Sequence, residues 1–530
     1  MDDLPSYHRP APATDRTETV DVCVYAANAA GVVAAIQARR LGLNVALLNP
    51  SWRVGGLTSC GLSYTDFGTQ DAIGGLALDF YRRVGAHYGK ETEWCFEPHV
   101  AERVLQAWLR EYGIEPWHGH YVCSVSRENA GIAELQTTSG ARVRAAYFLD
   151  CSYEGDLMAA AAVPYVVGRE SADTYGESYN GQQVHATHQF HYAVDPYVRP
   201  GDPSSGLLPG IDPDASFIPG AADRRVQAYN FRVCLTRRPD LRVPFRRPDG
   251  YDRGVYELLA RHFSAGAKET FAKFDRIQNG KTDTNNHGAV STDFIGGNWD
   301  WPEADYRSRE RNFQAHLRYQ MGYHWFMAND SAVPAPIRSA YAEWGPAADE
   351  FQESGHWPPQ LYIREARRLL GETVMTERHC FSAAEADDPI GLAAYTMDSH
   401  NCRRFVHRGM VLNEGNVEVK LPRPYGIGYR AIVPRHRVCD NLLVPVCLSA
   451  SHIAYGSIRM EPVFMILAQS AATAAFLAFK AGRAAVADVP YRDLRARLEQ
   501  DGQVVAWNPA SVHHPATVNE NIRGSDVPVR

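Results

Sequence analysis

The chain lacks features that would point to particular partners. Its 530 residues hold no basic cluster and carry a formal net charge of −7, which argues against a nucleic-acid partner. No run approaches about 18 apolar residues, and the first residues are polar and proline-bearing, without the apolar core of a signal peptide. We therefore expect no membrane partner and a cytoplasmic protein.

Cysteine and histidine offer no recognisable metal site. The ten cysteines are scattered, with no C-x-x-C pair and no zinc-type spacing, so we expect reduced, buried thiols. His185, His188 and His191 follow an H-x-x-H-x-x-H spacing, but no carboxylate follows at ligand spacing. We favour pocket or surface histidines over the alternative of a metal site, and predict no bound metal.

The N-terminal region is the most informative part of the chain. Val20–Tyr25 reads as a buried strand, Ala26–Gly31 as a tight turn of small residues, and Val32–Leu41 as a helix. Asn44–Asn49 is the next buried strand. Such a β-α-β unit can hold a dinucleotide, because the helix N-terminus favours the charge of a pyrophosphate.

The glycine fingerprint of this unit is incomplete. Of G-x-G-x-x-G only Gly31 remains; Ala26 and Asn28 replace the first two glycines, and Asn49 replaces the ribose-binding acid. An ordinary β-α-β unit without a ligand is therefore the alternative. The continuation Arg53–Ser59 places a cation and a glycine pair directly after the second strand. Flavin sites commonly carry this element, whereas NAD sites rarely need it.

The next segments predict a familiar layout. Gly75–Tyr88 and Glu97–Tyr112 read as helices, and Tyr121–Arg127, Ile132–Thr137 and Arg142–Asp150 as a three-stranded meander. A meander that returns to the parallel sheet is the layout of flavoproteins with two dinucleotide-binding folds. We predict an α/β fold: a Rossmann-like FAD-binding domain with a three-stranded β-meander, plus an α+β substrate lobe.

A late element returns the chain to the first sheet. Asn441–Cys447 reads as a buried strand, and a loop through Ser451 and His452 leads to the helix Val463–Lys480. That helix start would aim its positive dipole at the flavin pyrimidine edge. A purely structural C-terminal helix is the alternative.

The chain resembles a family of FAD-dependent oxidoreductases that carry G-G-(L/M)-T-(S/T)-G-G-L, Y-E-G-D-L and S-x-S-H…S-I-R-M-E-P motifs. The corresponding segments here are Gly55–Leu62, Tyr153–Leu157, Ser449–His452 and Ser457–Pro462. The resemblance spans about residues 20 to 482. It implies the fold of these flavoproteins and FAD as cofactor, and it defines no substrate.

The expected division of the chain has five parts. They are a disordered lead (1–18), the first part of the FAD-binding domain (19–170), a substrate or cap lobe (171–428), the return segment of the FAD-binding domain (429–484) and a C-terminal extension (485–530).

Two departures from the family pattern carry predictions. Asn49 is a neutral and weaker acceptor than a carboxylate, which predicts looser FAD binding. Cys60 stands where a glycine is usual. We favour a small buried residue there, and the alternative is a thiol that tunes, attacks or tethers at the flavin.

The candidate site residues divide into two groups. For catalysis, His452 is the first choice of base, with His287, His400 and Arg364 expected to contact substrate from the other lobe. The cofactor-binding candidates are Gly31, Asn49, Arg53, Gly55, Gly56, Leu57, Thr58, Cys60, Cys123, Asp150, Ser451, Arg459, Met460 and Glu461.

These features favour one function over two alternatives. The favoured hypothesis is an oxidoreductase that transfers a hydride from a small polar substrate (a polyol, sugar, glycoside or amine) to FAD. The alternatives are a flavin-assisted lyase acting on a sugar or glycoside without net redox change, and a degenerate flavoprotein scaffold. The sequence specifies neither the electron acceptor nor the oligomeric state.

Overall fold

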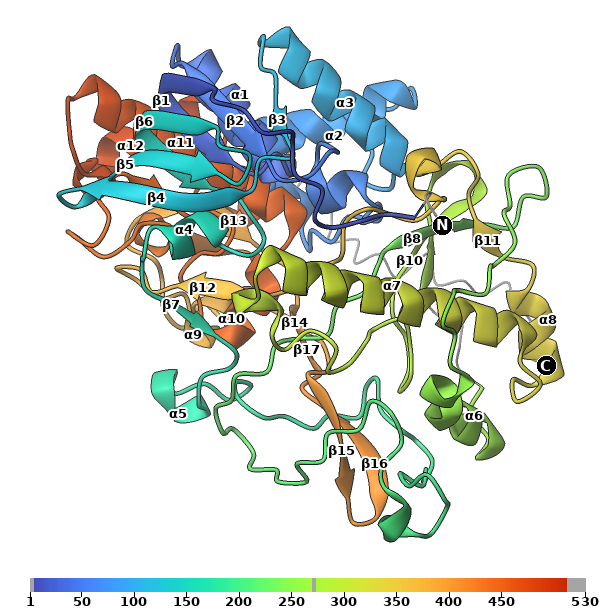
Figure 1. Ribbon diagram of the computed structural model, residues 1–530. Helices are drawn as coiled ribbons and strands as arrows, with labels where there is room; N and C mark the ends of the chain where they lie inside the picture. Colours follow the sequence, from blue (N-terminus) through green and yellow to red (C-terminus); the bar gives the residue numbers. More distant parts are fainter. Residues whose placement is uncertain (1–3, 269–272, 512–530) are drawn as a thin grey trace.

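The computed structural model describes residues 4–268 and 273–511. Its largest sheet has the strand order β3-β2-β1-β6-β5-β4 (Figure 1). β19 pairs with the second half of β6. β3, β2, β1, β6 and β19 run parallel, whereas β4, β5 and β6 form an antiparallel meander. The strands are β1 Thr17–Tyr25, β2 Val45–Asn49, β3 Trp117–His118, β4 Val122–Glu128, β5 Gly131–Thr137, β6 Arg142–Asp150 and β19 Leu442–Leu443.

The register of this sheet gathers three strand ends at one edge. Tyr25 at the end of β1 pairs with Leu48 of β2 and with Asp150 of β6. Asn49 therefore ends β2 at the same edge. Ligands of open parallel sheets bind beyond the carboxyl ends of the strands, so this edge is where a cofactor site is expected.

Helices cover the sheet through small side chains. α1 (Ala29–Arg40) packs against α11 (Glu461–Lys480), and Gln37 Nε2 of α1 donates to Thr473 Oγ1 of α11 at 2.9 Å. The many alanines of both helices allow this close approach. The neighbouring helices are α2 Gly75–His87, α3 Pro98–Glu111 and α12 Tyr491–Gln500.

α11 differs from the expectation that no segment approaches the length and apolarity of a membrane-spanning helix. Within the described ranges it is the single helix that is long and apolar enough to cross a membrane. However, 83% of its most apolar stretch is buried inside the protein. Its apolarity is therefore accounted for by its place in the core, and the absence of a membrane partner stays a prediction.

Much of the rest of the chain forms a second lobe below the sheet in Figure 1. The long helix α7 (Tyr306–Asn329) crosses this lobe beside a small sheet of order β11-β8-β10-β9. That sheet comprises β8 Val233–Thr236, β9 Phe274–Arg276, β10 Lys281–Thr284 and β11 Gly345–Pro346. Four further strand pairs are β7 Tyr165–Val167 with β12 Arg367–Leu369, β13 Pro389–Ala393 with β18 Tyr425–Gly428, β14 Met397–Ser399 with β17 Val417–Val419, and β15 Arg403–His407 with β16 Met410–Glu414. The short helices are α4 Asp156–Ala160, α5 Ala172–Tyr175, α6 Glu257–Ser264, α8 Ala335–Tyr341, α9 Glu377–Cys380 and α10 His452–Ile458. Of these elements, α4 packs on the large sheet itself and β13 packs on α11.

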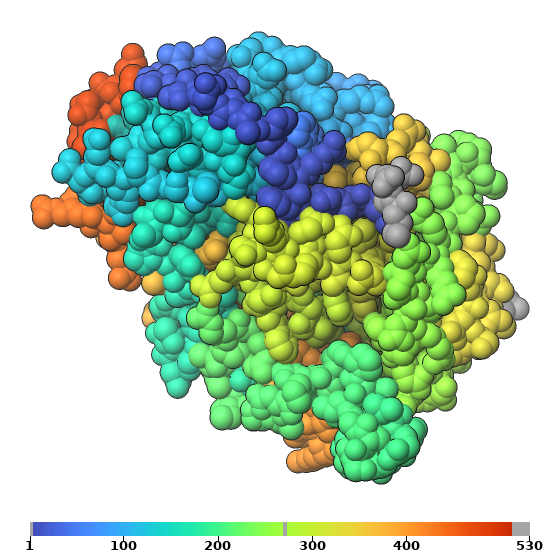
Figure 2. Space-filling view, in the orientation of Figure 1, coloured from blue at the N-terminus to red at the C-terminus, as the bar shows by residue number. Residues whose placement is uncertain are grey.

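The prediction of a disordered lead (1–18) is wrong for residues 4–18, and residues 1–3 lie outside the described residues. The Tyr7 ring lies 4.9 Å from the Trp301 ring, and Arg309 Nη1 donates to its hydroxyl at 3.2 Å. Figure 2 shows this dark blue segment lying between the sheet domain and α7. The buried aromatic side chain supplies the ordering that the polar composition did not suggest.

The structure confirms the predicted α/β fold and most of its first elements, and it corrects the late region. Only Leu442–Leu443 of the expected strand Asn441–Cys447 pairs with the sheet. His452, expected in a loop, is the first residue of α10. Of the expected C-terminal extension, residues 512–530 lie outside the described residues.

Candidate active site

The turn between β1 and α1 forms the first half of the site. Ala26 adopts a positive φ of 76°, and a Cβ on Gly31 would lie 1.8 Å from the Ala26 carbonyl oxygen. Asn28 caps α1: its Oδ1 accepts from Gly31 N at 2.9 Å, and its Nδ2 donates to Cys151 O at 2.5 Å. The Ala30 N–H is buried, and no described group accepts from it. A buried helix N-terminus with a spare donor suits a phosphate.

The glycine pair after β2 closes over this turn. Gly55 and Gly56 adopt φ values of 101° and 55°, which favour glycine. Gly55 N donates to Ala27 O at 2.8 Å. A Cβ on Gly56 would lie 2.5 Å from the Tyr153 hydroxyl and 2.6 Å from Asn28 Cβ. The two glycine segments predicted from the sequence therefore meet.

Asn49 has a role in the loop that the sequence did not indicate. Its Oδ1 accepts from Ala27 N at 3.2 Å, and its Nδ2 donates to Arg53 O at 3.0 Å. A carboxylate cannot donate, so only the amide makes both bonds. Asn49 thus ties the β1–α1 turn to the loop after β2.

Arg53 is already paired. Its guanidinium lies 2.8 Å from a Glu102 carboxylate oxygen and 2.7 Å from a Glu353 oxygen, and its Nε donates to Ser59 O at 3.3 Å. The sequence predicted that Arg53 would bind the cofactor, whereas its guanidinium group is already paired with carboxylates of the protein. The side chain instead holds the glycine loop against α3, which carries Glu102.

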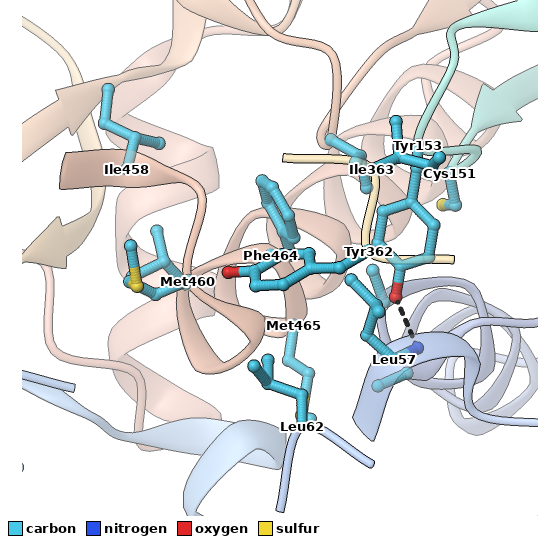
Figure 3. Close-up of a cluster of buried hydrophobic side chains, with 14 of the residues drawn as sticks. Leu57, Leu62, Cys151, Tyr153, Tyr362, Ile363, Ile458, Met460, Phe464 and Met465 are labelled. Atoms are coloured by element: carbon cyan, nitrogen blue, oxygen red, sulfur yellow. Dashed lines mark hydrogen bonds between the residues drawn. The ribbon is translucent and has the colours of Figure 1, made fainter. Parts of the chain in front are cut away.

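The start of α11 meets the same loop through a buried carboxyl group. Thr58 Oγ1 donates to Glu461 Oε2 at 2.5 Å, and the Tyr153 hydroxyl donates to Glu461 Oε1 at 2.9 Å. The Tyr153 oxygen accepts from Leu57 N at 3.0 Å, as the dashed line in Figure 3 marks. Burial raises the pKa of Glu461 to about 7. A cavity of about 10 Å³ beside it, lined also by Met460, has room for about one water molecule.

The raised pKa of Glu461 predicts a pH-dependent stability of the FAD-free protein. An unfolded glutamate titrates near 4.5, so the folded carboxyl keeps its proton up to about pH 7. The free energy of unfolding should therefore fall between these pH values, on the order of 3 kcal/mol from this group. Glu461→Gln should flatten that part of the profile, measured by urea unfolding from pH 4.5 to 8. Parallel profiles of the two proteins would contradict the prediction.

Three predicted cofactor residues have other surroundings. Burial raises the pKa of the Cys60 thiol to about 12, so it stays neutral and is a poor nucleophile near pH 7. Cys123 is exposed on β4, and β5 and β6 separate that strand from β1, so it does not reach the site. Asp150 accepts from Ser152 N at 3.0 Å and from Met158 N at 2.8 Å, which orders the turn into α4.

A buried cluster of charges gathers candidates from distant segments. His400 Nδ1 lies 2.8 Å from Asp293 Oδ2, and its Nε2 lies 3.4 Å from Asp398 Oδ2. Asp293 also pairs with Arg364 at 2.9 Å, and Asp398 with Arg459 at 2.9 Å. Burial alone would raise the pKa of Asp398, but His400, when it is protonated, and Arg459 hold this pKa well below its usual value. The structure thus brings together three of the predicted residues, His400, Arg364 and Arg459.

Tyr362 joins this charged cluster to the glycine loop. Arg459 Nη1 donates to the Tyr362 hydroxyl at 2.7 Å. Figure 3 draws Tyr362 in one buried group with Leu57 of the loop and Met460 at the start of α11. The candidate substrate-binding side chains therefore adjoin the candidate cofactor site.

His452 lies in a hydrogen-bond network that leads to the backbone of His400. Its Nδ1 is 2.7 Å from Glu365 Oε2, and its Nε2 is 3.1 Å from Ser399 Oγ. Glu365 accepts from Gln227 Nε2 at 2.9 Å, and Gln227 Oε1 accepts from His400 N at 3.1 Å. Both ring nitrogens of the first-choice base are thus engaged by protein groups, in a fully buried position.

The remaining two candidates, Ser451 and His287, contact side chains outside this cluster. Ser451 caps α10 and donates to Glu177 Oε1 at 2.6 Å. The His287 ring lies 5.5 Å from the His188 ring, and His188 Nε2 lies 3.1 Å from a Glu418 oxygen. These contacts give Ser451 a structural role and place His287 against a second histidine.

One group of side chains has the geometry of a metal site in the described part of the chain. Glu97, His99 and Glu350 place their ligand atoms within 4.8 Å of one another. The Lys281 ammonium group lies 2.6 Å from Glu97 and 2.8 Å from Glu350. A cation already balances these carboxylates, so the group favours a structural salt-bridge network.

Sequence reasoning missed four residues of the cluster. Tyr362 and Glu365 lie in the segment that carries Arg364, and Asp398 lies two residues before His400, so their spacing was a usable signal. Asp293 lies 107 positions from His400 and had no local signal.

Comparison with known proteins decides the family. Residues 21–498 match the model of a family described as FAD dependent oxidoreductase. The chain belongs to the FAD-dependent oxidoreductase family. It is therefore an FAD-dependent oxidoreductase, and FAD is its cofactor. No curated protein matches the chain.

Solved structures resemble only part of this FAD-dependent oxidoreductase. An L-amino acid deaminase from Proteus vulgaris is 13% identical, over 34% of this chain and 57% of that one, with a TM-score of 0.24. Sdh1 of Mycobacterium smegmatis is 15% identical, over 30% and 42%, with a TM-score of 0.21. A 3-ketosteroid-Δ4-(5α)-dehydrogenase from Rhodococcus jostii RHA1 is 16% identical, over 31% and 53%, with a TM-score of 0.20. The chain thus spans less than two thirds of each of them, and their substrates say nothing about its own.

The residues of the first half fit the cofactor. The α1 N-terminus offers the buried Ala30 N–H to a phosphate, and Gly31 allows the turn to approach it. Gly55 and Gly56 bring the following loop against this turn. These residues would hold the pyrophosphate part of FAD, with Asn49 at the adjoining strand end.

Proposed function

We propose that this FAD-dependent oxidoreductase oxidises a small polar organic substrate, a polyol, sugar, glycoside or amine, and that His400 takes up the proton. FAD, when bound, accepts the hydride. Histidine suits proton uptake near neutral pH, and a positioned acid–base group contributes about 10²- to 10⁴-fold in rate.

The pairing of His400 with two aspartates carries this proposal. Donation of Nδ1–H to Asp293, 2.8 Å away, fixes the tautomer in which Nε2 has the free lone pair. The 3.4 Å separation from Asp398 to Nε2 is longer than a good hydrogen bond, so Nε2 can accept from a substrate hydroxyl or ammonium group. Both carboxylates would then stabilise the imidazolium ion.

We assign His452 the role of a positioning residue. The contacts from His452 through Glu365 and Gln227 to the backbone of His400 support this role. A proton acceptor at His452 itself, the preference from the sequence, remains the second proposal for the base.

Anaerobic bleaching of the flavin tests the proposed function. The purified protein should retain one FAD, or bind it on reconstitution, and show flavin absorbance near about 450 nm. A panel of polyols, sugars, glycosides and amines should contain a compound that bleaches this band and is recovered two electrons more oxidised. An eliminated product with no net oxidation would replace the proposal by the lyase alternative. A protein that cannot be loaded with FAD would contradict the proposed function altogether.

A further inference from the structure

Three buried guanidinium groups surround the ring of Tyr362. Their central carbons lie 4.7 Å (Arg364), 5.6 Å (Arg232) and 5.7 Å (Arg459) from the ring centroid. None of these arginines is more than 4% exposed. Asp283 neutralises Arg232 through two bonds of 2.7 and 2.8 Å, so the charge of this arginine is already paired.

Arg364 and Arg459 are less completely satisfied. The Nε of each is buried and has no hydrogen-bond partner in the described part of the protein. Each aspartate beside them is shared with His400. Burial, together with the charges of Arg459 and Arg232, lowers the pKa of the Arg364 guanidinium. Buried cationic donors without acceptors are costly, so this pair is arranged for a further anion.

We propose that Arg364 and Arg459 bind a carboxylate group of the substrate. This inference rests on the proposed function, since it names the substrate class of the same site: an organic acid that also carries an alcohol or amine. The unpartnered Nε–H of each arginine can donate one charge-assisted hydrogen bond to a carboxylate oxygen. Asp293 and Asp398 already pair with the two arginines, and the Asp66 carboxyl group also acts on Arg459. A monoanion therefore meets less repulsion at this position than a phosphate dianion, which favours a carboxylate.

Binding of small probes to the FAD-loaded protein tests the proposal without turnover. Acetate and glycolate should perturb the flavin absorption band and raise the melting temperature, whereas ethylene glycol at equal concentration should do neither. Inorganic phosphate should compete weakly with acetate. Tighter binding of phosphate than of acetate would overturn the carboxylate assignment, and so would equal responses to glycolate and ethylene glycol.

Substitutions of the arginines test where acetate binds. Arg364→Gln and Arg459→Gln should each weaken acetate binding about 10- to 100-fold in FAD-loaded protein, because each removes a charged donor. Arg459→Lys, which keeps the charge, should lose less. Arg404→Gln is the matched control: this buried arginine donates to Asn413 Oδ1 at 3.0 Å and to Ala289 O at 2.9 Å, and its loss should leave acetate affinity unchanged.

The carboxylate proposal and the proposed function can be disproved separately. If the protein binds FAD and is bleached by neutral polyols while acetate neither binds nor inhibits, the carboxylate proposal is wrong and the proposed function stands. If no FAD can be loaded, the proposed function fails before the arginines are tested.

Discussion

His400→Gln should slow flavin reduction by the true substrate about 10²- to 10⁴-fold, with FAD still bound. Glutamine can replace the hydrogen bond from Nδ1 to Asp293, but it cannot take up a proton. The rate is measured by anaerobic stopped-flow absorbance under single-turnover conditions, and FAD content and melting temperature are recorded on the same samples. A variant that reduces its flavin as fast as the parent would exclude His400 as the base.

His452→Gln is the matched comparison. His452 bonds Glu365 and Ser399 in a fully buried position, so its replacement should lower the melting temperature more than His400→Gln does. Its effect on flavin reduction should be the smaller of the two, since it acts through the position of His400. A larger rate loss in His452→Gln with unchanged stability would return the base to His452.

The dinucleotide half of the fold was predictable because its signals are local. Val20–Tyr25 and Asn44–Asn49 are continuous apolar runs, as strands buried on both faces must be, and the small-residue turn between them announces the helix N-terminus. The structure extends β1 back to Thr17 and starts α1 at Ala29. Periodicity defines such elements well and their ends poorly.

The second lobe was less predictable because its order comes from long-range contacts. α7 is polar on average, and its buried face includes Arg309 and His316, so apolar periodicity does not reveal it. Arg309 is held by two hydrogen bonds from its guanidinium group to the Asp156 carboxylate, of 2.7 and 2.9 Å. Buried ion pairs between distant positions leave no pattern in a single sequence.

The residues of the candidate site also divide into those with a local sequence signal and those that depend on distant contacts. Gly31, Gly55 and Gly56 were predictable because only glycine fits each close approach, a constraint visible in the motif itself. The pairing of Arg53 with Glu102 and Glu353, by contrast, depends on how α3 and a distant loop pack. A charged side chain in a motif shows that a charge is needed there, and only its neighbours decide what it neutralises.

Gly31→Ala should destabilise the protein by roughly 3 kcal/mol and prevent retention of FAD. The added Cβ would lie 1.8 Å from the Ala26 carbonyl oxygen, and no flexible side chain can move aside, because the obstacle is backbone. Ala26 already has a φ of 76°, so the turn has little freedom to adjust. The helix N-terminus should shift, and the Asn28 cap and the Ala30 N–H should move with it.

Urea unfolding measures the stability of Gly31→Ala, and the flavin-to-protein absorbance ratio after gel filtration measures retention. Gly131→Ala is the control in the same sheet: its φ is not positive, and the atoms nearest to its Cβ would belong to the Asn441 side chain, at 3.3 Å or more. That variant should keep its FAD and lose less than about 1 kcal/mol. Since the two substitutions add the same methyl group, a difference between them reports the contact with Ala26. Equal stability and FAD retention in both variants would mean that the β1–α1 turn does not hold the cofactor as described.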